Sequence, residues 1–324
     1  MKRICIAMLA AVLLASCVPQ AASPTPTALT KIRLPAGYIP DVQFASVYVA
    51  LEKGYFQQAG LDVTLDYSQE TDGVALVGTG TLQFALASGE QVLLARAQGL
   101  PIVYVLAWYQ QYPVGVTSST REGIHAPADL KGKKIGLPVQ AGASYIGLRA
   151  LLQAGGLKES DVTLESIGFN QVEALVSGRV QAAVIYINNE PIKLAAQNFP
   201  ANTLRVADYM QLVGNGLITN EDTIRKDPGL VQRMAGAMLK GMQDALANPD
   251  AAYTICLKYV ENLAQADQKV QKQVLTTSME LWKAPHLGQS DPKAWNNMQT
   301  IMLQMGQYKT ALDVSQAFTN QFVP

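Results

Sequence analysis

The chain has 324 residues, of which 49% are hydrophobic and 15% are charged, and its formal net charge is zero. A neutral chain lacks the basic surface with which proteins bind nucleic acid or an anionic membrane surface, so we expect neither as a partner. The length is sufficient for a large hydrophobic core and for more than one domain.

The first sixteen residues are typical of a secretory signal peptide. Lys2-Arg3 precedes an apolar run of about 12 residues, whereas a membrane-spanning helix needs roughly 20. The run ends in Leu14-Ala15-Ser16-Cys17, which fits a lipoprotein signal peptidase. We predict a signal peptide over residues 1–16 and lipidation, with palmitate among the acyl chains, at Cys17. An ordinary signal peptide with a chance cysteine is the alternative. Stable anchoring generally requires two acyl chains.

Residues 17–30 are rich in Pro, Ser, Thr and Ala and carry no charge, which predicts a lipidated tether without a core of its own. Cys5 is lost with the signal peptide and Cys17 carries lipid, so Cys256 is the one cysteine left in the folded part. No intramolecular disulfide is possible, and the fold depends on its hydrophobic core.

Strands and helices alternate over the first part of the folded chain, which predicts a parallel-rich sheet with helices on both faces. We predict strands at residues 31–34, 61–67, 82–87 and 102–108, and helices at 42–51, 74–77 and 90–98.

The alternation then repeats, and beyond Asn220 the pattern becomes helical, with Pro228 at a first-turn position. Here we predict strands at 135–139, 162–167, 182–187, 204–207 and 217–219, and helices at 142–153, 171–177, from Pro191, and at 222–248, 249–261, 264–282 and 292–305.

This order predicts an α/β clamshell with a helical C-terminal part. Lobe 1 is expected to comprise residues 31–115 and 219–324, and lobe 2 residues 116–218. The loops at the carboxyl ends of the strands would face a central cleft, where open α/β sheets bind ligands. A doubly wound enzyme is the alternative.

Catalytic and metal-binding motifs are absent from the sequence. The two histidines, His125 and His286, lie near no cysteine or carboxylate at ligand spacing, and no Cys-x-x-Cys, Gly-x-Ser-x-Gly or Walker motif occurs. We expect no catalytic residues, no metal and no cofactor, and hence a binding protein.

Three segments resemble one family. They are Gly37-Tyr38-Ile-Pro40 with residues 49–63 (Val-Ala-Leu-Glu-Lys-Gly-Tyr-Phe-Gln-Gln-Ala-Gly-Leu-Asp-Val), residues 129–136 (Asp-Leu-Lys-Gly-Lys-Lys-Ile-Gly), and residues 174–183, where Gln181 replaces a usual Asp. The chain resembles ABC-importer binding proteins for thiamine pyrimidine precursors, riboflavin, taurine and alkanesulfonates, and most of all the riboflavin and pyrimidine-precursor branch. The cysteine-rich motif of the pyrimidine-synthase members is absent, which favours transport.

The resemblance implies a two-lobed periplasmic-binding-protein-like clamshell of type II. It also implies an extracytoplasmic protein, anchored to the cell membrane by its lipid, that delivers a small molecule to an ABC permease and ATPase. We expect it to be a monomer.

Aromatic and polar side chains at the predicted strand ends are the candidate ligand-binding residues. Core packing by the aromatic rings and helix capping by Ser88 and Glu90 are the structural alternatives, and Tyr112 and Asn215 are weaker candidates of the same kind. The candidates are Tyr38, Asp41, Gln43, Ser88, Glu90, Trp108, Tyr109, Ser144, Tyr145, Tyr186, Asn188, Asn189 and Glu190.

A flat ligand with ring nitrogens and carbonyls suits these residues, because no arginine can be placed in the cleft. Riboflavin ranks first, since its tricyclic ring would contact several aromatic side chains. A thiamine pyrimidine precursor ranks second, and taurine or an alkanesulfonate third. Two other classes of function remain: an extracytoplasmic enzyme with Glu90 or Glu190 as base, and a ligand sensor for a membrane kinase.

Overall fold

The computed structural model describes residues 28–324. The predicted signal peptide, Cys17 and most of the tether lie outside the described residues. Within residues 28–324, no helix is both long enough and apolar enough to cross a membrane.

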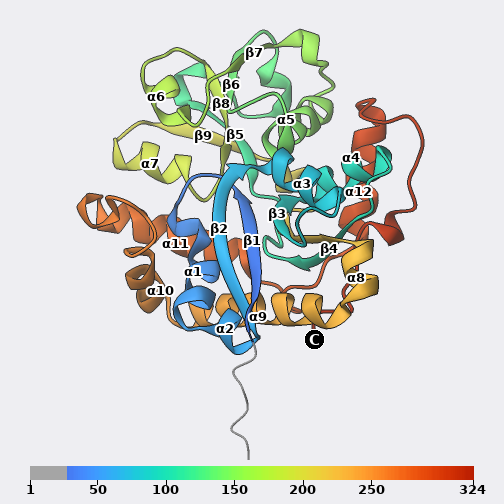
Figure 1. Ribbon diagram of the computed structural model, residues 1–324. Coiled ribbons are helices and arrows are strands. Elements are labelled where there is room, and N and C mark those ends of the chain that lie inside the picture. The colour runs from blue at the N-terminus through green and yellow to red at the C-terminus, as the bar shows by residue number, and fades with distance from the viewer. Residues whose placement is uncertain (1–27) are drawn as a thin grey trace, which may run out of the picture.

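The strands of the described chain form three sheets (Figure 1). Sheet one pairs β1 (Thr30–Gly37) with β2 (Leu61–Gln69). Sheet two has the order β3 (Ala85–Ser88), β10 (Asn215–Asn220), β4 (Ile102–Ala107). Sheet three has the order β7 (Thr163–Ser166), β6 (Lys134–Leu137), β8 (Ala182–Tyr186), β5 (Val114–Ser119), β9 (Ala201–Arg205).

The molecule has the two-lobed α/β clamshell form that the sequence predicts. Figure 1 shows the five-stranded sheet in the upper lobe and the two smaller sheets in the lower lobe. The chain passes between the lobes twice, once from β4 to β5 and once from β9 to β10. The lobe limits at residues 115/116 and 218/219 stay predictions. The strand pairing suggests limits a few residues earlier, because β5 begins at Val114 and β10 at Asn215.

The prediction of one parallel-rich sheet in the first lobe is wrong. Among the strands of residues 28–324, β1 and β2 form the one parallel pair of this lobe, and β10 lies antiparallel between β3 and β4. The order of the elements along the chain could not show this, because β10 returns to the first lobe only after the whole second lobe. Strand β5 was not predicted at all; it pairs antiparallel with β8 and β9.

Helices surround the sheets of both lobes. Those of the second lobe are α5 (Gly142–Ala154), α6 (Gln171–Val176) and α7 (Glu190–Ala196). Those of the first lobe are α1 (Ala45–Glu52), α2 (Tyr55–Gln58), α3 (Glu70–Gly78), α4 (Gly89–Ala97), α8 (Glu221–Lys226), α9 (Pro228–Ala247), α10 (Pro249–Cys256), α11 (Gln268–Trp282) and α12 (Pro292–Gln304).

The helix predicted over residues 222–248 is divided at Asp227. A proline disfavours helical backbone at the residue that precedes it. Asp227 is therefore not helical, α8 ends at Lys226, and Pro228 begins α9. The Asp227 carboxylate accepts a hydrogen bond from the Leu230 N–H over 2.8 Å and caps the new helix.

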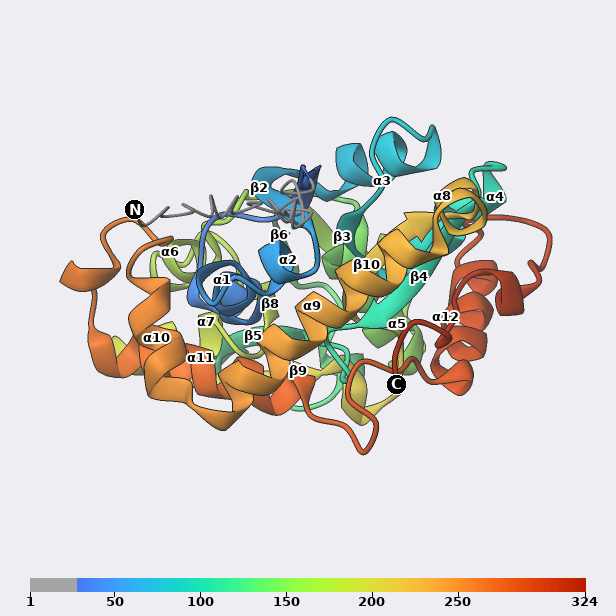
Figure 2. The same ribbon diagram turned by 60° about the horizontal axis from the view of Figure 1, so that its bottom comes forward.

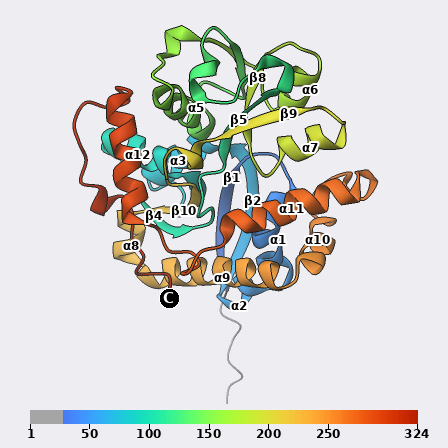
Figure 3. The ribbon, with the colours of Figure 1, turned by 180° about the vertical axis from the view of Figure 1, so that it is seen from behind.

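The long helix α9 crosses the base of the first lobe (Figure 2). It lies so close to α1 that a Cβ at Gly241 would be 2.8 Å from the Cβ of Ala50. Seen from behind, α11 approaches the second lobe while α12 lies beside α4 (Figure 3). The Cys256 thiol is free and buried, and burial raises its pKa to about 12.

Candidate functional site

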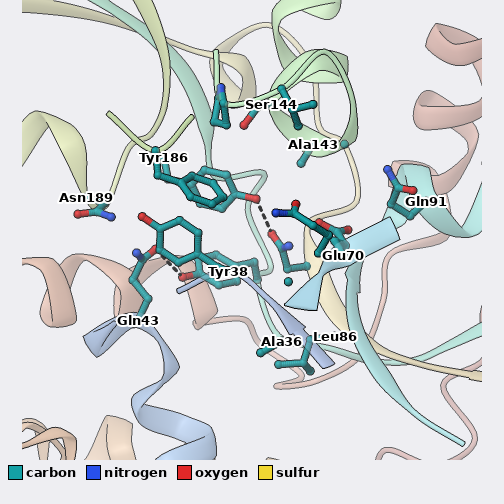
Figure 4. A pocket seen from close by; sticks show the side chains of 18 of the residues that line it. Ala36, Tyr38, Gln43, Glu70, Leu86, Gln91, Ala143, Ser144, Tyr186 and Asn189 are labelled. Atoms are coloured by element: carbon teal, nitrogen blue, oxygen red, sulfur yellow. Dashed lines mark hydrogen bonds between the residues drawn. The ribbon is translucent and has the colours of Figure 1, made fainter. Parts of the chain in front are cut away.

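A cavity of about 410 Å³ lies between the two lobes, within the usual size range of small-molecule sites. Figure 4 shows part of its wall. Its lining residues are Ala36, Gly37, Tyr38, Gln43, Phe44, Gln69, Glu70, Thr71, Leu86, Gln91, Trp108, Tyr109, Pro138, Val139, Ala141, Gly142, Ala143, Ser144, Phe169, Gln171, Tyr186, Asn189, Glu190 and Asn215.

Aromatic rings from both lobes make up much of this wall. Tyr38 follows β1 in the first lobe and meets Phe169 of the second lobe edge to face, with ring centroids 4.8 Å apart. Trp108 packs against Phe44 at 5.3 Å and against Tyr109 at 5.0 Å. Packed rings hold one another in fixed orientations and leave faces on which a planar ligand can stack.

Gly37 positions two of the lining side chains. Its φ is +75°, in the left-handed region that favours glycine, and a Cβ there would be 3.1 Å from the Cβ of Glu70. The glycine thus permits the end of β1 to lie against the start of α3. As a result, Tyr38 and Glu70 lie in the wall of one cavity.

Hydrogen bonds join the lobes beside the cavity. The Asn188 Nδ2 donates to Gln43 Oε1 and to Ser278 Oγ, each over 2.7 Å. The Tyr186 hydroxyl donates to Asn215 Oδ1 over 3.2 Å, one of the dashed lines in Figure 4. Asn188 and Tyr186 belong to the second lobe, and their three partners belong to the first, so polar side chains couple the lobes directly.

Glu190 is a buried carboxyl group in the lining. Burial is the largest cause that raises its pKa, to about 7, although its Oε2 accepts a hydrogen bond from the Tyr186 N–H over 2.9 Å. Within the described chain, the neighbouring Asn189 Oδ1 and the Trp108 Nε1 are buried without a hydrogen-bond partner. The wall therefore contains one unused acceptor and one unused donor, and buried polar atoms of this kind normally have a partner.

Two further carboxyl groups share one serine. The Ser88 N–H donates to Glu70 Oε1 over 2.6 Å, and the Ser88 hydroxyl lies within hydrogen-bonding distance of both Glu70 Oε1 and Glu90 Oε1. Burial raises the pKa of both carboxyl groups. For Glu90 the charge of Glu70 adds to the effect of burial, and its pKa reaches about 8. Of the two, Glu70 lines the cavity.

The structure brings most of the sequence-predicted residues to the cavity. Those in the lining are Tyr38, Gln43, Trp108, Tyr109, Ser144, Tyr186, Asn189 and Glu190, together with Asn215. Ser88, Glu90 and Asn188 lie outside the lining, and each forms a hydrogen bond with a residue that belongs to it: Glu70, Gln91 and Gln43, respectively.

Three other candidates have structural contacts instead. The Asp41 carboxylate accepts from the Gln43 N–H over 3.0 Å and caps a short turn of helix. Tyr145 contacts Arg149 and Glu159 through its hydroxyl, away from the cavity lining. The buried Tyr112 donates to the Ala143 carbonyl over 2.8 Å, so it packs in the core behind α5.

Sequence reasoning missed several lining residues that share one signal: they follow the carboxyl end of a strand, where ligands bind in α/β folds. They come after β2, β6 and β7 and are Glu70, Thr71, Pro138, Val139, Phe169 and Gln171.

The chain is similar over nearly its whole length to known binding proteins. It is 38% identical over 314 residues to the riboflavin-binding protein RibY of Chloroflexus aurantiacus, covering 94% of this chain and 90% of that protein. It is 30% identical over 304 residues to the formylaminopyrimidine-binding protein of Halalkalibacterium halodurans, covering 90% of each. A more distant similarity, 27% over 237 residues and 69% of each chain, is to the yeast 4-amino-5-hydroxymethyl-2-methylpyrimidine phosphate synthase THI13.

Solved structures share the fold. The alkanesulfonate-binding protein SsuA of Xanthomonas axonopodis pv. citri, bound to MOPS, superposes with a TM-score of 0.71 at 15% identity, covering 91% of this chain and 99% of that one. The predicted clamshell of the periplasmic-binding-protein type is thereby confirmed, as is the family resemblance. Residues 41–252 match the family model described as NMT1/THI5 like, and the chain belongs to this family.

Proposed function

We propose that this protein is the substrate-binding component of an ABC importer and that it binds a flat heteroaromatic vitamin, with riboflavin as the first candidate. The main support is the composition of the cavity wall. Aromatic rings from both lobes line it, its charged residues are the two carboxyl groups Glu70 and Glu190, and the lining found in residues 28–324 includes no lysine or arginine.

An uncharged planar ligand fits such a wall. Each aromatic contact adds about 0.5–1.5 kcal/mol beyond burial, so two rings supply a sizeable part of a micromolar affinity of about −8 kcal/mol. The hydroxyl groups of a sugar-like chain can pair with the amide groups of Gln43, Asn189 and Asn215. The name and the 38% identity of the relative RibY support riboflavin in particular.

A thiamine pyrimidine precursor of the formylaminopyrimidine type is the second candidate, because the similarity to that binding protein also extends over 90% of this chain. Taurine or an alkanesulfonate ranks third. A sulfonate is a permanent anion, and the lining found in residues 28–324 offers it two carboxyl groups, Glu70 and Glu190, but no cationic side chain with which to pair.

Catalysis by Glu190 as a base is the alternative from another class, and the similarity to yeast synthases is its support. The chain is more similar to two proteins named for binding than to the synthases, which favours binding without turnover.

The cellular setting belongs to the same proposal. Lipid on Cys17 would hold an extracytoplasmic, monomeric clamshell near its permease, and closure of the lobes around the ligand would produce the form that the permease receives.

A thermal-shift panel tests the ligand class. A ligand that binds only the folded protein raises its Tm by mass action. We expect an increase with riboflavin, a smaller or comparable one with formylaminopyrimidine, and none with MOPS. Mass spectrometry of the ligand released after incubation should show it unchanged. A shift with MOPS alone would contradict the ligand class, and a converted ligand would contradict the binding role.

A further inference from the structure

Glu70, Ser88 and Glu90 form a buried group that we call the carboxyl cluster. It joins the first turn of α3, the end of β3 and the first turn of α4. The Ser88 hydroxyl lies within hydrogen-bonding distance of a Glu70 oxygen and of a Glu90 oxygen. A hydroxyl has only one hydrogen to donate, so a carboxyl O–H must donate in one of these two contacts. The geometry therefore calls for a proton on one of the two carboxyl groups.

The hydrogen bonds indicate which carboxyl group holds it. Glu70 Oε1 also accepts from the Ser88 N–H over 2.6 Å, and this second donor favours the ionised form of Glu70. Glu90 is fully buried, the second donor to its Oε1 is Gln91 Nε2 at the longer distance of 3.3 Å, and its Oε2 has no hydrogen-bond partner among the described residues, which together favour the neutral form of Glu90.

The surroundings supply no positive charge to the cluster. In the part of the chain that the structure describes, neither Glu70 nor Glu90 takes part in a salt bridge. The titratable groups that face it from β4, from the loop after β4 and from β8 are three tyrosines, and burial raises the pKa of each, so all three are neutral. They are Tyr104, Tyr112 and Tyr186.

We propose that the cluster retains one proton at neutral pH, held on Glu90, and that the ionised Glu70 is a specificity determinant that accepts a hydrogen bond from an N–H or O–H group of the ligand. In this arrangement Glu90 Oε1–H donates to Ser88 Oγ, and the Ser88 hydroxyl donates to Glu70 Oε1. The other oxygen of Glu70 is then the acceptor that the cavity offers. The ligand part of this proposal rests on the proposed function.

The matching ligand edge is an imide N–H, a ring amino group or a hydroxyl group. A simple alkanesulfonate, which lacks an amino or hydroxyl group, has no such donor and would meet a like charge. The cluster therefore distinguishes donor-bearing heterocycles from anions in the same fold.

Whether Glu90 retains a proton can be tested without any ligand. The experiment compares the thermal unfolding of the wild type and of Glu90→Gln between pH 5 and pH 8. An unfolded glutamic acid loses its proton near pH 4.3, whereas the folded protein retains it, so the wild type loses stability as the pH rises through this window. The difference in Tm, Glu90→Gln minus wild type, should therefore increase by about 5 °C or more between pH 5 and pH 8.

Glu280→Gln is the matched control, since Glu280 is an exposed residue of α11. It should follow the wild type at every pH. Parallel profiles for the wild type and Glu90→Gln would overturn the protonated cluster. If Glu90→Gln does not fold, infrared spectra of Glu190→Gln decide, because this variant lacks the other buried carboxyl group of raised pKa: a protonated-carboxyl band should disappear between pH 6 and pH 9.5, and its absence at pH 6 would also overturn the proposal.

The ligand contact is tested with riboflavin as the probe. Glu70→Gln should bind riboflavin at least tenfold more weakly than the wild type at pH 7, while Glu280→Gln should bind like the wild type. Equal affinity of Glu70→Gln and the wild type would refute the specificity role. Failure of the wild type itself to bind riboflavin would count against the proposed function, and the unfolding experiment would still decide on the cluster.

Discussion

The side-chain amide of Asn188 donates a hydrogen bond over 2.7 Å to the side-chain oxygen of Gln43, a residue 145 positions away in the other lobe. Gln43 lines the cavity, whereas Asn188 is fully buried outside the lining and also donates to Ser278. One amide group thus connects the ligand-facing wall of the first lobe to the second lobe. A ligand that contacts Gln43 would therefore act on the same hydrogen bonds that hold the lobes together.

Replacement of Asn188 by alanine should lower the free energy of unfolding by about 1–3 kcal/mol, because it leaves Gln43 Oε1 and Ser278 Oγ without this buried donor. Urea unfolding measures the change. Asn296→Ala is the control, since Asn296 is exposed on α12 and bonds only within its own helix. An equal, small effect in both variants would show that the contact between the lobes contributes nothing to the free energy of unfolding.

Removal of the rings of Tyr38 or Tyr186 should weaken riboflavin binding about tenfold each, since each loss of an aromatic contact and its burial costs about 1.4 kcal/mol or more. Titration calorimetry of Tyr38→Ala and Tyr186→Ala provides the measurement, with circular dichroism to confirm folding. Tyr209→Ala, at an exposed position, is the control. Wild-type affinity in both cavity variants would mean that the ligand binds elsewhere.

Glu190 should make stability depend on pH. Its folded pKa of about 7 exceeds the value near 4.3 of an unfolded glutamic acid. The stabilising effect of its proton is complete below pH 4.3 and is lost as the pH rises to 7, by at most about 1.4 kcal/mol per pH unit. The unfolding free energy of the wild type minus that of Glu190→Gln should therefore fall as the pH rises through this window. Above pH 7 the difference should stay constant. A difference that does not vary between pH 5 and pH 7 would contradict this assignment.

Two glycines of α9 should respond in opposite ways to alanine. At Gly241 the new Cβ would press on the backbone and side chains of α1, so Gly241→Ala should lose about 1–3 kcal/mol of stability. At Gly236 nothing lies within 4 Å, so Gly236→Ala should gain about 0.5–1 kcal/mol from helix propensity. Chemical denaturation of the pair tests the close packing of α1 on α9, and a loss of the same size in both would disprove it.

Lipidation should depend on Cys17. In cells fed labelled palmitate, the wild type should carry the label and sediment with membranes, whereas Cys17→Ser should carry none and be released. Label retained by Cys17→Ser would refute the predicted anchor. Cys256→Ser is the control, because the Cys256 thiol is buried in the folded protein.

Local patterns in the sequence were sufficient for most elements. The alternating residues 61–67 lie within β2, and the apolar residues 182–187 include β8. Both strands could be predicted because the signal lies in their own side chains. Pairing between distant strands could not be derived in the same way. Strand β10 inserts between β3 and β4, and no local pattern records that position. Strand β5 was missed because its residues, Val-Gly-Val-Thr-Ser-Ser, end in polar and small side chains that resemble a loop.

The site was predictable to the extent that strand ends were located correctly. Tyr186 ends β8, Asn189 follows that strand, and both line the cavity as expected. Glu70 is not among the predicted site residues, because α3 begins four residues earlier than its apolar residues suggest. The sharing of Ser88 by Glu70 and Glu90 depends on how α3 packs against β3, which is a tertiary contact that sequence spacing does not reveal.

Riboflavin titration followed by tryptophan fluorescence tests the central claim most directly, because Trp108 is in the wall of the cavity. We expect saturable quenching with a stoichiometry of one and a Kd near or below about 1 μM, and Trp108→Phe should lose most of the signal change. Quenching that rises linearly with riboflavin and never saturates, in the wild type as in Trp108→Phe, would contradict it.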